Sequence, residues 1–115
     1  MPTSERGDYE NPIKSAYSVE RYDSSWEREY MKRLERDKTV VKWTKNHGIT
    51  IQYVTEAGNI RGYRPDFLIE RIGGTVELHE IKGGQYLYNL DTIRKHEAAT
   101  NWCRKRKMAF VVVTK

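Results

Sequence analysis

Three charged residues of this chain have the types and the spacing of a metal-dependent site. Thirteen residues separate Asp66 from Glu80, and Lys82 follows Glu80 at i+2. Because side chains alternate along a β-strand, Glu80 and Lys82 would share one face with Val76 and Leu78. Charged groups in line with apolar residues are partly desolvated, which is costly unless they are paired or bind a metal ion. The simpler alternative is a surface i,i+2 ion pair at the end of a strand.

The chemistry that such a group could do is metal-assisted hydrolysis. A tight hairpin centred on Gly73-Gly74 would pair position 66 with one near 81 and bring the carboxylates of Asp66 and Glu80 together. Oxygen ligands suit Mg²⁺, for which Mn²⁺ can substitute, and the ion would bind Asp66, Glu80 and the carbonyl of Ile81. Such an ion neutralises charge on a phosphate and acidifies a bound water, and Lys82 would position that water or stabilise the transition state.

The elements that must position these residues follow from periodicity and turn residues. Ser24-Ser25-Trp26-Glu27 fits a capping box at the start of a helix, and the adjacent glycines 73 and 74 fit a two-residue hairpin loop. Apolar residues at helical or strand spacing extend between the turns. The pattern predicts a helix at 25–37, extended segments at 40–41 and 49–54, strands at 61–72 and 75–82, a helix at 91–107 and a strand at 108–113.

This order, α-β-β-β-α-β, predicts an α/β fold with a mixed sheet flanked by helices. The last strand would join the others through a helical crossover, and its apolar run indicates burial on both faces. Residues 1–23 lack sustained periodicity, so we expect a flexible N-terminal arm followed by one domain at 24–115. The tyrosines at positions 9, 17 and 22 leave docking of that arm open.

Charge favours an anionic partner. The chain carries a net charge of +5, and residues 24–115 hold eighteen Lys and Arg against eleven Asp and Glu, or +7. Such an excess favours nucleic acid, with a merely well-solvated surface as the alternative. There is no apolar run long enough to span a bilayer and no signal-peptide pattern, so we expect a cytoplasmic protein without membrane contact. The single cysteine, Cys103, is expected in the core.

Two basic segments are candidates for contact with nucleic acid. Lys42 and Lys45 flank Trp43, whose ring either stacks on a base or belongs to the core. Arg104 and Lys105 lie in a basic run that either contacts phosphates or complements the negative end of a helix dipole. Histidines 47, 79 and 96 lack the mutual spacing of metal ligands.

Pro65-Asp66 followed by Glu80-Ile81-Lys82 resembles the signature of the PD-(D/E)xK nuclease superfamily. The chain is also similar to the endonuclease domain of type III restriction enzymes and to TnsA-like endonuclease subunits of cut-and-paste transposons. The segments that carry this similarity are 25–27, 41–46, 63–67, 80–83 and 95–99 with Trp102. The resemblance implies a restriction-endonuclease-like core at about residues 24–113.

The resemblance also implies further site residues and a function. Glu27 matches an additional catalytic acidic residue on the first helix, although it would equally serve as a helix cap. Lys95 matches a downstream basic position near the start of the second helix, where it would either reach the phosphate backbone or be solvated. Gln85 matches a polar site position. The implied function is Mg²⁺-dependent endonucleolytic hydrolysis of DNA, with target choice from a homodimer, from a partner subunit or from nucleic-acid shape. The alternatives are a non-cleaving nucleic-acid-binding subunit, a junction resolvase, and a domain that binds an acidic protein.

Overall fold

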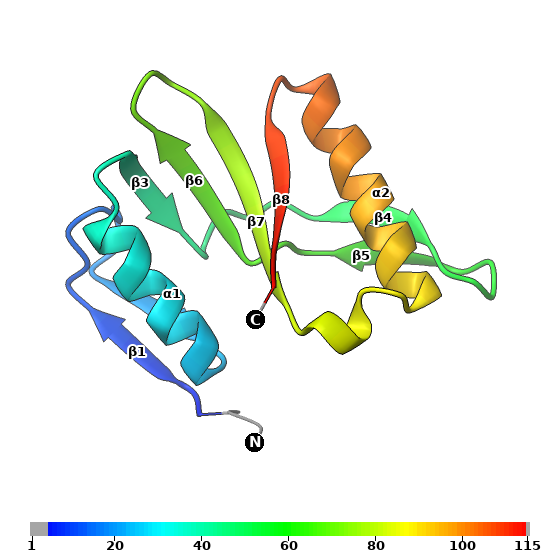
Figure 1. The fold of residues 1–115 in the computed structure, drawn as a ribbon, viewed down its shortest axis with the longest axis horizontal. Coiled ribbons are helices and arrows are strands. Elements are labelled where there is room, and N and C mark those ends of the chain that lie inside the picture. The colour runs from blue at the N-terminus through cyan, green and yellow to red at the C-terminus, as the bar shows by residue number, and fades with distance from the viewer. Residues whose placement is uncertain (1–4, 115) are drawn as a thin grey trace.

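The fold is a mixed four-stranded sheet with one helix packed on each face (Figure 1). A computed structural model describes residues 5–114. Its elements in chain order are β1 (Gly7–Glu10), β2 (Val19–Tyr22), α1 (Ser25–Arg36), β3 (Val40–Thr44), β4 (Ile51–Val54), β5 (Ile60–Tyr63), β6 (Phe67–Arg71), β7 (Val76–Lys82), the 3₁₀ turn η1 (Gly84–Tyr86), α2 (Leu90–Lys105) and β8 (Ala109–Thr114).

The sheet has the strand order β3-β6-β7-β8. β6 is antiparallel to both β3 and β7, and β8 lies parallel to β7 after the α2 crossover. The elements α1, β3, β6, β7, α2 and β8 therefore reproduce the predicted α-β-β-β-α-β order. The mixed α/β fold expected from the sequence is confirmed.

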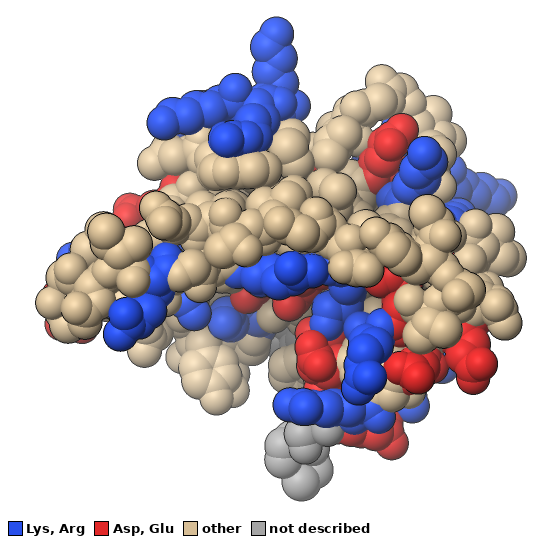
Figure 2. Space-filling model, turned by 180° about the vertical axis from the view of Figure 1, so that it is seen from behind, with Lys and Arg blue, Asp and Glu red and all other residues tan. Residues whose placement is uncertain are grey.

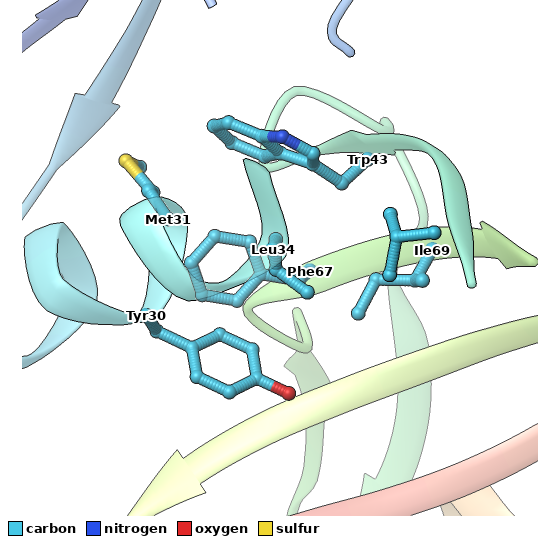
Figure 3. Close-up of a cluster of buried hydrophobic side chains, with 7 residues drawn as sticks. Tyr30, Met31, Leu34, Trp43, Phe67 and Ile69 are labelled. Atoms are coloured by element: carbon cyan, nitrogen blue, oxygen red, sulfur yellow. The ribbon is translucent and has the colours of Figure 1, made fainter. Parts of the chain in front are cut away.

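The helix α1 covers one face of the sheet. Its N-cap Ser24 accepts a hydrogen bond from the backbone of Glu27, as the capping box predicts. Apolar residues of α1 that are one helical turn apart form a buried stripe, which packs on inward-facing side chains of β3 and β6. Figure 3 shows this cluster, which consists of Tyr30, Met31, Leu34, Trp43, Phe67 and Ile69, together with Val40.

The helix α2 covers the opposite face. Leu78 of β7 packs with Ala99 and Cys103 of α2, and Cys103 is 1% exposed, so its predicted place in the core is confirmed. Adjacent residues of a strand point to opposite faces, so Leu78 and Glu80 face α2, whereas His79 faces α1 and hydrogen bonds to Tyr30. No helix among residues 5–114 is long and apolar enough to cross a membrane.

The strand predicted at 61–72 is in fact two strands that belong to different sheets. The chain breaks after Tyr63, where Pro65 has no N–H to donate to a ladder. β5 pairs with β4 in a separate ribbon, and β6 joins the main sheet beside β3. The prediction of one continuous strand at 61–72 in the main sheet is therefore wrong, because β4 and β5 leave the sheet and pack against α2.

The expectation that the last strand is buried on both faces is also wrong. β8 is the final strand of the sheet, and the residues between its two exposed ends are only half-buried. The apolar run of β8 does form a strand parallel to β7. The crossover helix α2 covers one face of this strand, which accounts for its apolar residues. The other long side of β8 has no neighbour among the described strands, which explains the partial exposure.

The segment expected to be a flexible arm contains a docked hairpin in the structure. β1 and β2 pair from Gly7 to Tyr22, and Tyr9 packs edge-to-face on Trp43 with ring centroids 6.1 Å apart. Glu20 of β2 is 2% exposed and accepts a hydrogen bond from the backbone of Lys45. Residues 1–4 of the expected arm lie outside the described residues, and a folding boundary at residue 24 stays a prediction.

Glu35 of α1 ties the loop between β1 and β2 to the core. Its carboxylate accepts hydrogen bonds from the backbones of Ile13 and Lys14, at 2.7 and 3.0 Å, and from the indole of Trp43 at 2.9 Å. We expect Glu35→Ala to lower the free energy of unfolding by about 2 kcal/mol, because partly buried donors lose their acceptor. Urea denaturation measures this loss. Glu29→Ala, on the exposed side of the same helix, is the control, and an equal effect of both changes would contradict the anchoring role.

Candidate active site

The register of the β6–β7 hairpin decides whether Asp66 can meet Glu80. Phe67 pairs with His79 and Leu68 with Leu78. The same register, extended by one residue, places Asp66 opposite Glu80. The backbone N–H of Arg71 donates to the carbonyl of Thr75, so the loop has three residues, 72–74, and the expected two-residue loop is wrong. A shift of one residue reverses the face of every side chain. Only the observed register, and not the expected pairing of 66 with 81, puts both carboxylates on the α2 face.

Asp66, Glu80 and Lys82 converge where β7 ends and β6 begins. Oδ2 of Asp66 accepts a hydrogen bond from the backbone N–H of Ile81 at 2.8 Å. The Nζ of Lys82 lies 3.5 Å from Oε2 of Glu80, so the two form an i,i+2 ion pair. This pair is not the surface pair of the simpler alternative, since Glu80 is 6% exposed and the Lys82 side chain 22%. The structure therefore brings the three central site candidates together.

The two carboxyl groups resist ionisation together. Burial, followed by the nearby Glu80 carboxylate, raises the pKa of Asp66 from 3.8 to about 8. Burial also raises the pKa of Glu80, while the neighbouring Tyr63 hydroxyl and the Lys82 ammonium act against that rise. Two acids with raised pKa values at one position are typical of a functional site, because a bound cation would stabilise both charges.

The oxygen atoms present here fit a divalent cation. Oε1 of Glu80 is buried and has no hydrogen-bond partner among the described residues. Asp66 uses only Oδ2 toward Ile81, and the Ile81 carbonyl faces the same side of β7 as its N–H group. Within residues 5–114 no three acidic, histidine or cysteine side chains form a metal-binding group. Two carboxylates and a carbonyl suit Mg²⁺, which usually retains several waters.

Glu27 lies at the edge of this group but is engaged by other residues. It is close enough to Asp66 for its charge to raise that residue's pKa. Its Oε1 accepts a hydrogen bond from the backbone N–H of Asp23, the residue before the N-cap, and it forms a salt bridge with Lys45. The Lys45 ammonium also lies 3.0 Å from Oδ2 of Asp23. Lys45 is thus a half-buried counter-ion of two carboxylates, and its contact with nucleic acid stays a prediction.

The remaining basic candidates lie at different distances from the site. Lys95 of α2 lies over the ring of Tyr63, with Nζ 5.8 Å from the ring centroid, so the structure places it beside the site. Lys42 is exposed on β3. Arg104 and Lys105 end α2, where Lys and Arg side chains gather at the upper edge of Figure 2. This end of α2 adjoins the start of β8, about 16 Å along the strand from the level of Lys82.

The structure also settles several other expectations from the sequence. Trp43 is 1% exposed, so its ring belongs to the core and is not available to stack on a base. Gln85 is exposed in the turn that follows β7. His79 is 2% exposed and hydrogen bonds to Tyr30 and Glu77, which confirms it as a packed strand residue on the face away from Glu80.

Two residues near the site were not among the candidates from the sequence. The Tyr63 hydroxyl lies beside the Glu80 carboxylate, and burial and that carboxylate raise the pKa of Tyr63. His96 of α2 packs on Tyr63 with ring centroids 6.4 Å apart, and burial and then the Lys82 charge lower its pKa. The only signal in the sequence was that Tyr63 and His96 lie in the segments 63–67 and 95–99 that carry the family resemblance.

Comparison with known proteins agrees with this geometry. The family model described as TnsA-like endonuclease N terminal matches residues 37–115. The matched region contains Asp66, Glu80 and Lys82 but begins after α1, so it does not include Glu27. No curated protein matches the chain significantly. A match over most of the chain, on a mixed α/β fold with two carboxylates and a lysine at its centre, shows that the chain belongs to the TnsA-like endonuclease N-terminal family, a restriction-endonuclease-like nuclease family.

Proposed function

We propose that this protein hydrolyses phosphodiester bonds of DNA with a divalent cation held by Asp66, Glu80 and the carbonyl of Ile81. The observation that carries this proposal is the convergence of two partly desolvated carboxylates with the ammonium of Lys82. Removal of charged groups from water costs stability, and a site for a charged ligand explains why the fold accepts that cost. Membership of a nuclease family supports the same assignment.

The protein groups have distinct proposed roles. Asp66 and Glu80 hold the cation, which when bound would neutralise charge on the scissile phosphate and acidify a water molecule. Lys82 lies on the same face, where its ammonium would hold the attacking water or the charge that develops on the phosphate oxygens. Glu27 would assist through its charge near Asp66, and this role requires that Lys45 release it or share it.

Contact with the DNA backbone would come from the exposed cations. Lys95 lies beside the site, and Arg104 and Lys105 lie about 16 Å along β8, roughly half a turn of B-DNA. One duplex could therefore contact both places, with Lys42 as a further phosphate contact. These charges contribute affinity without reading the base sequence. Target choice would come from a second copy of the chain or from a partner subunit.

Cleavage of supercoiled plasmid tests the proposal. The protein is incubated with plasmid in Mg²⁺ or Mn²⁺, with and without chelator, and nicked and linear products are resolved on a gel. We expect products only when the cation is present and free. Products that persist in excess chelator would contradict the cation-dependent site.

A non-cleaving DNA-binding subunit is the second candidate. The observation in its favour is that Glu27 is paired with Lys45 and that no third acidic, histidine or cysteine side chain completes a metal-binding group within residues 5–114. A gel-shift experiment separates the candidates. A shifted duplex without cleavage in either cation would favour this second function, and binding of neither duplex nor cation would contradict both.

A further inference from the structure

Three polar atoms next to the proposed site are buried without a hydrogen-bond partner among the described residues. They are Oη of Tyr63, Oε1 of Glu80 and Nε2 of His96. Tyr63 is 5% exposed and Glu80 is 6% exposed, so water does not readily compensate for the missing bonds. Buried polar groups are almost always hydrogen bonded, and a group of exceptions at one place requires a functional explanation.

The ring of Tyr63 is held firmly from several directions. Phe110 contacts it edge-to-face and His96 lies tilted against it, each with a centroid separation of 6.4 Å, while the Lys95 ammonium lies 5.8 Å from its centroid. The hydroxyl lies beside the Glu80 carboxylate, close enough for that carboxylate to raise the pKa of Tyr63, but it forms no well-aligned hydrogen bond among the described residues. A phenol can donate one hydrogen bond, and a carboxylate oxygen can accept two.

We propose that Tyr63 is a positioning residue of the active site, whose hydroxyl donates a hydrogen bond to Glu80 and holds that carboxylate in the orientation that binds the cation. Lys82 already holds Oε2 of Glu80, and Tyr63 would hold the otherwise unpartnered Oε1. Each oxygen keeps a further lone pair for the cation. Carboxylates that bind metals are commonly oriented by such outer partners. This inference rests on the proposed function.

The departure of the chain from the main sheet sets the position of Tyr63. Tyr63 ends β5, and its backbone pairs with Ile51 of β4 in the two-stranded ribbon that packs on α2. Three residues later the chain supplies Asp66, and Pro65 between them has a fixed φ. The ribbon therefore places the Tyr63 hydroxyl beside Glu80. The strands β6 and β8, which flank β7, do not supply an aromatic hydroxyl at this position.

The substitution Tyr63→Phe tests this role, because it removes one oxygen and keeps the ring. Tyr53→Phe is the matched control, since Tyr53 lies in the same ribbon with Lys95 5.6 Å from its centroid. Calorimetric titration with Mn²⁺ alone, without DNA, measures cation affinity, and melting temperature reports the fold. We expect Tyr63→Phe to weaken Mn²⁺ binding by about 10- to 100-fold without a lower melting temperature, and Tyr53→Phe to change neither.

A double-mutant cycle shows whether Tyr63 acts through Glu80. In a Glu80→Gln background we expect Tyr63→Phe to change the remaining Mn²⁺ affinity by less than about twofold, because the group that it orients is already altered. Unchanged Mn²⁺ affinity of Tyr63→Phe would overturn the inference while leaving the proposed function intact. An equal loss in both tyrosine variants, or a loss explained by a lower melting temperature, would also overturn it. Absence of Mn²⁺ binding by the unmodified protein would instead overturn the proposed function, and the inference with it.

Discussion

Asp66→Asn is expected to abolish DNA cleavage and, above neutral pH, to make the protein more stable. Cleavage should fall by at least about a thousandfold, because the amide cannot supply the negative charge that a divalent cation needs. The amide oxygen can still accept the hydrogen bond that Oδ2 now accepts from the backbone of Ile81. The variant therefore loses an unfavourable charge without losing its main polar contact. We expect its melting temperature at about pH 9 to exceed that of the unmodified protein by about 5 °C.

The direction of this effect follows from the raised pKa of Asp66. Burial and the Glu80 carboxylate raise that pKa from 3.8 to about 8, so between these values the folded state holds a proton that the unfolded state has lost. Stability from this group is therefore complete below about pH 4 and declines as the pH rises toward about 8. The variant lacks this decline, so its advantage should be large at about pH 9 and small at about pH 5.

Melting curves measured across this pH range, together with the plasmid assay, check both halves of the prediction. Glu56→Gln is a suitable control, because Glu56 is exposed in the turn between β4 and β5 and should alter neither quantity. A destabilised Asp66→Asn protein at about pH 9 would contradict the unfavourable charge. An advantage that is the same at about pH 5 would show that it does not arise from ionisation. Retained cleavage would remove Asp66 from the proposed active site.

Lys82→Ala is expected to lower the cleavage rate by about a hundred- to a thousandfold while the protein remains folded. The Lys82 side chain is 22% exposed and its ion pair with Glu80 is at the end of β7, so its removal leaves the core clusters intact. The ammonium matters more for chemistry, because it is the only side-chain cation that forms a salt bridge with Glu80 in residues 5–114. Its charge would stabilise the phosphate oxygens during attack.

Circular dichroism and the rate of plasmid nicking at saturating Mg²⁺ check this prediction. Lys42→Ala removes an exposed lysine of β3 and should reduce affinity for DNA but not the rate at saturating protein. Similar losses of rate in both lysine variants would show that Lys82 contributes only general charge. Loss of the folded spectrum would show that Lys82 is needed for structure, contrary to its position at the strand end.

Local sequence patterns determined most of the elements. The capping box at Ser24 and the one-turn spacing of apolar residues place α1 within a residue of its predicted end. Gly73 and Gly74 both take positive φ in the β6–β7 loop, a conformation that glycine adopts without a steric penalty. Strict alternation along β7 also assigned Glu80 and Lys82 to one face. These features depend on nearest neighbours along the chain, so the residues alone are enough to specify them.

The tertiary structure decided which of those residues meet. A β6–β7 loop of three residues, and not two, places Asp66 opposite Glu80. No local pattern in the sequence distinguishes a two-residue loop from a three-residue loop, whereas the packing of Leu78 against α2 fixes the register. The departure of β4 and β5 from the sheet, which brings Tyr63 to Glu80, depends on contacts with α2 far along the chain. Likewise, the pairing of Lys45 with Glu27 requires α1 and the end of β3 to be packed together. The sequence by itself therefore determined the helices and strands and identified Asp66, Glu80 and Lys82 as the central residues. Long-range packing decided the strand register and which side chains lie beside these residues, because both depend on how the apolar faces of the helices and strands are buried.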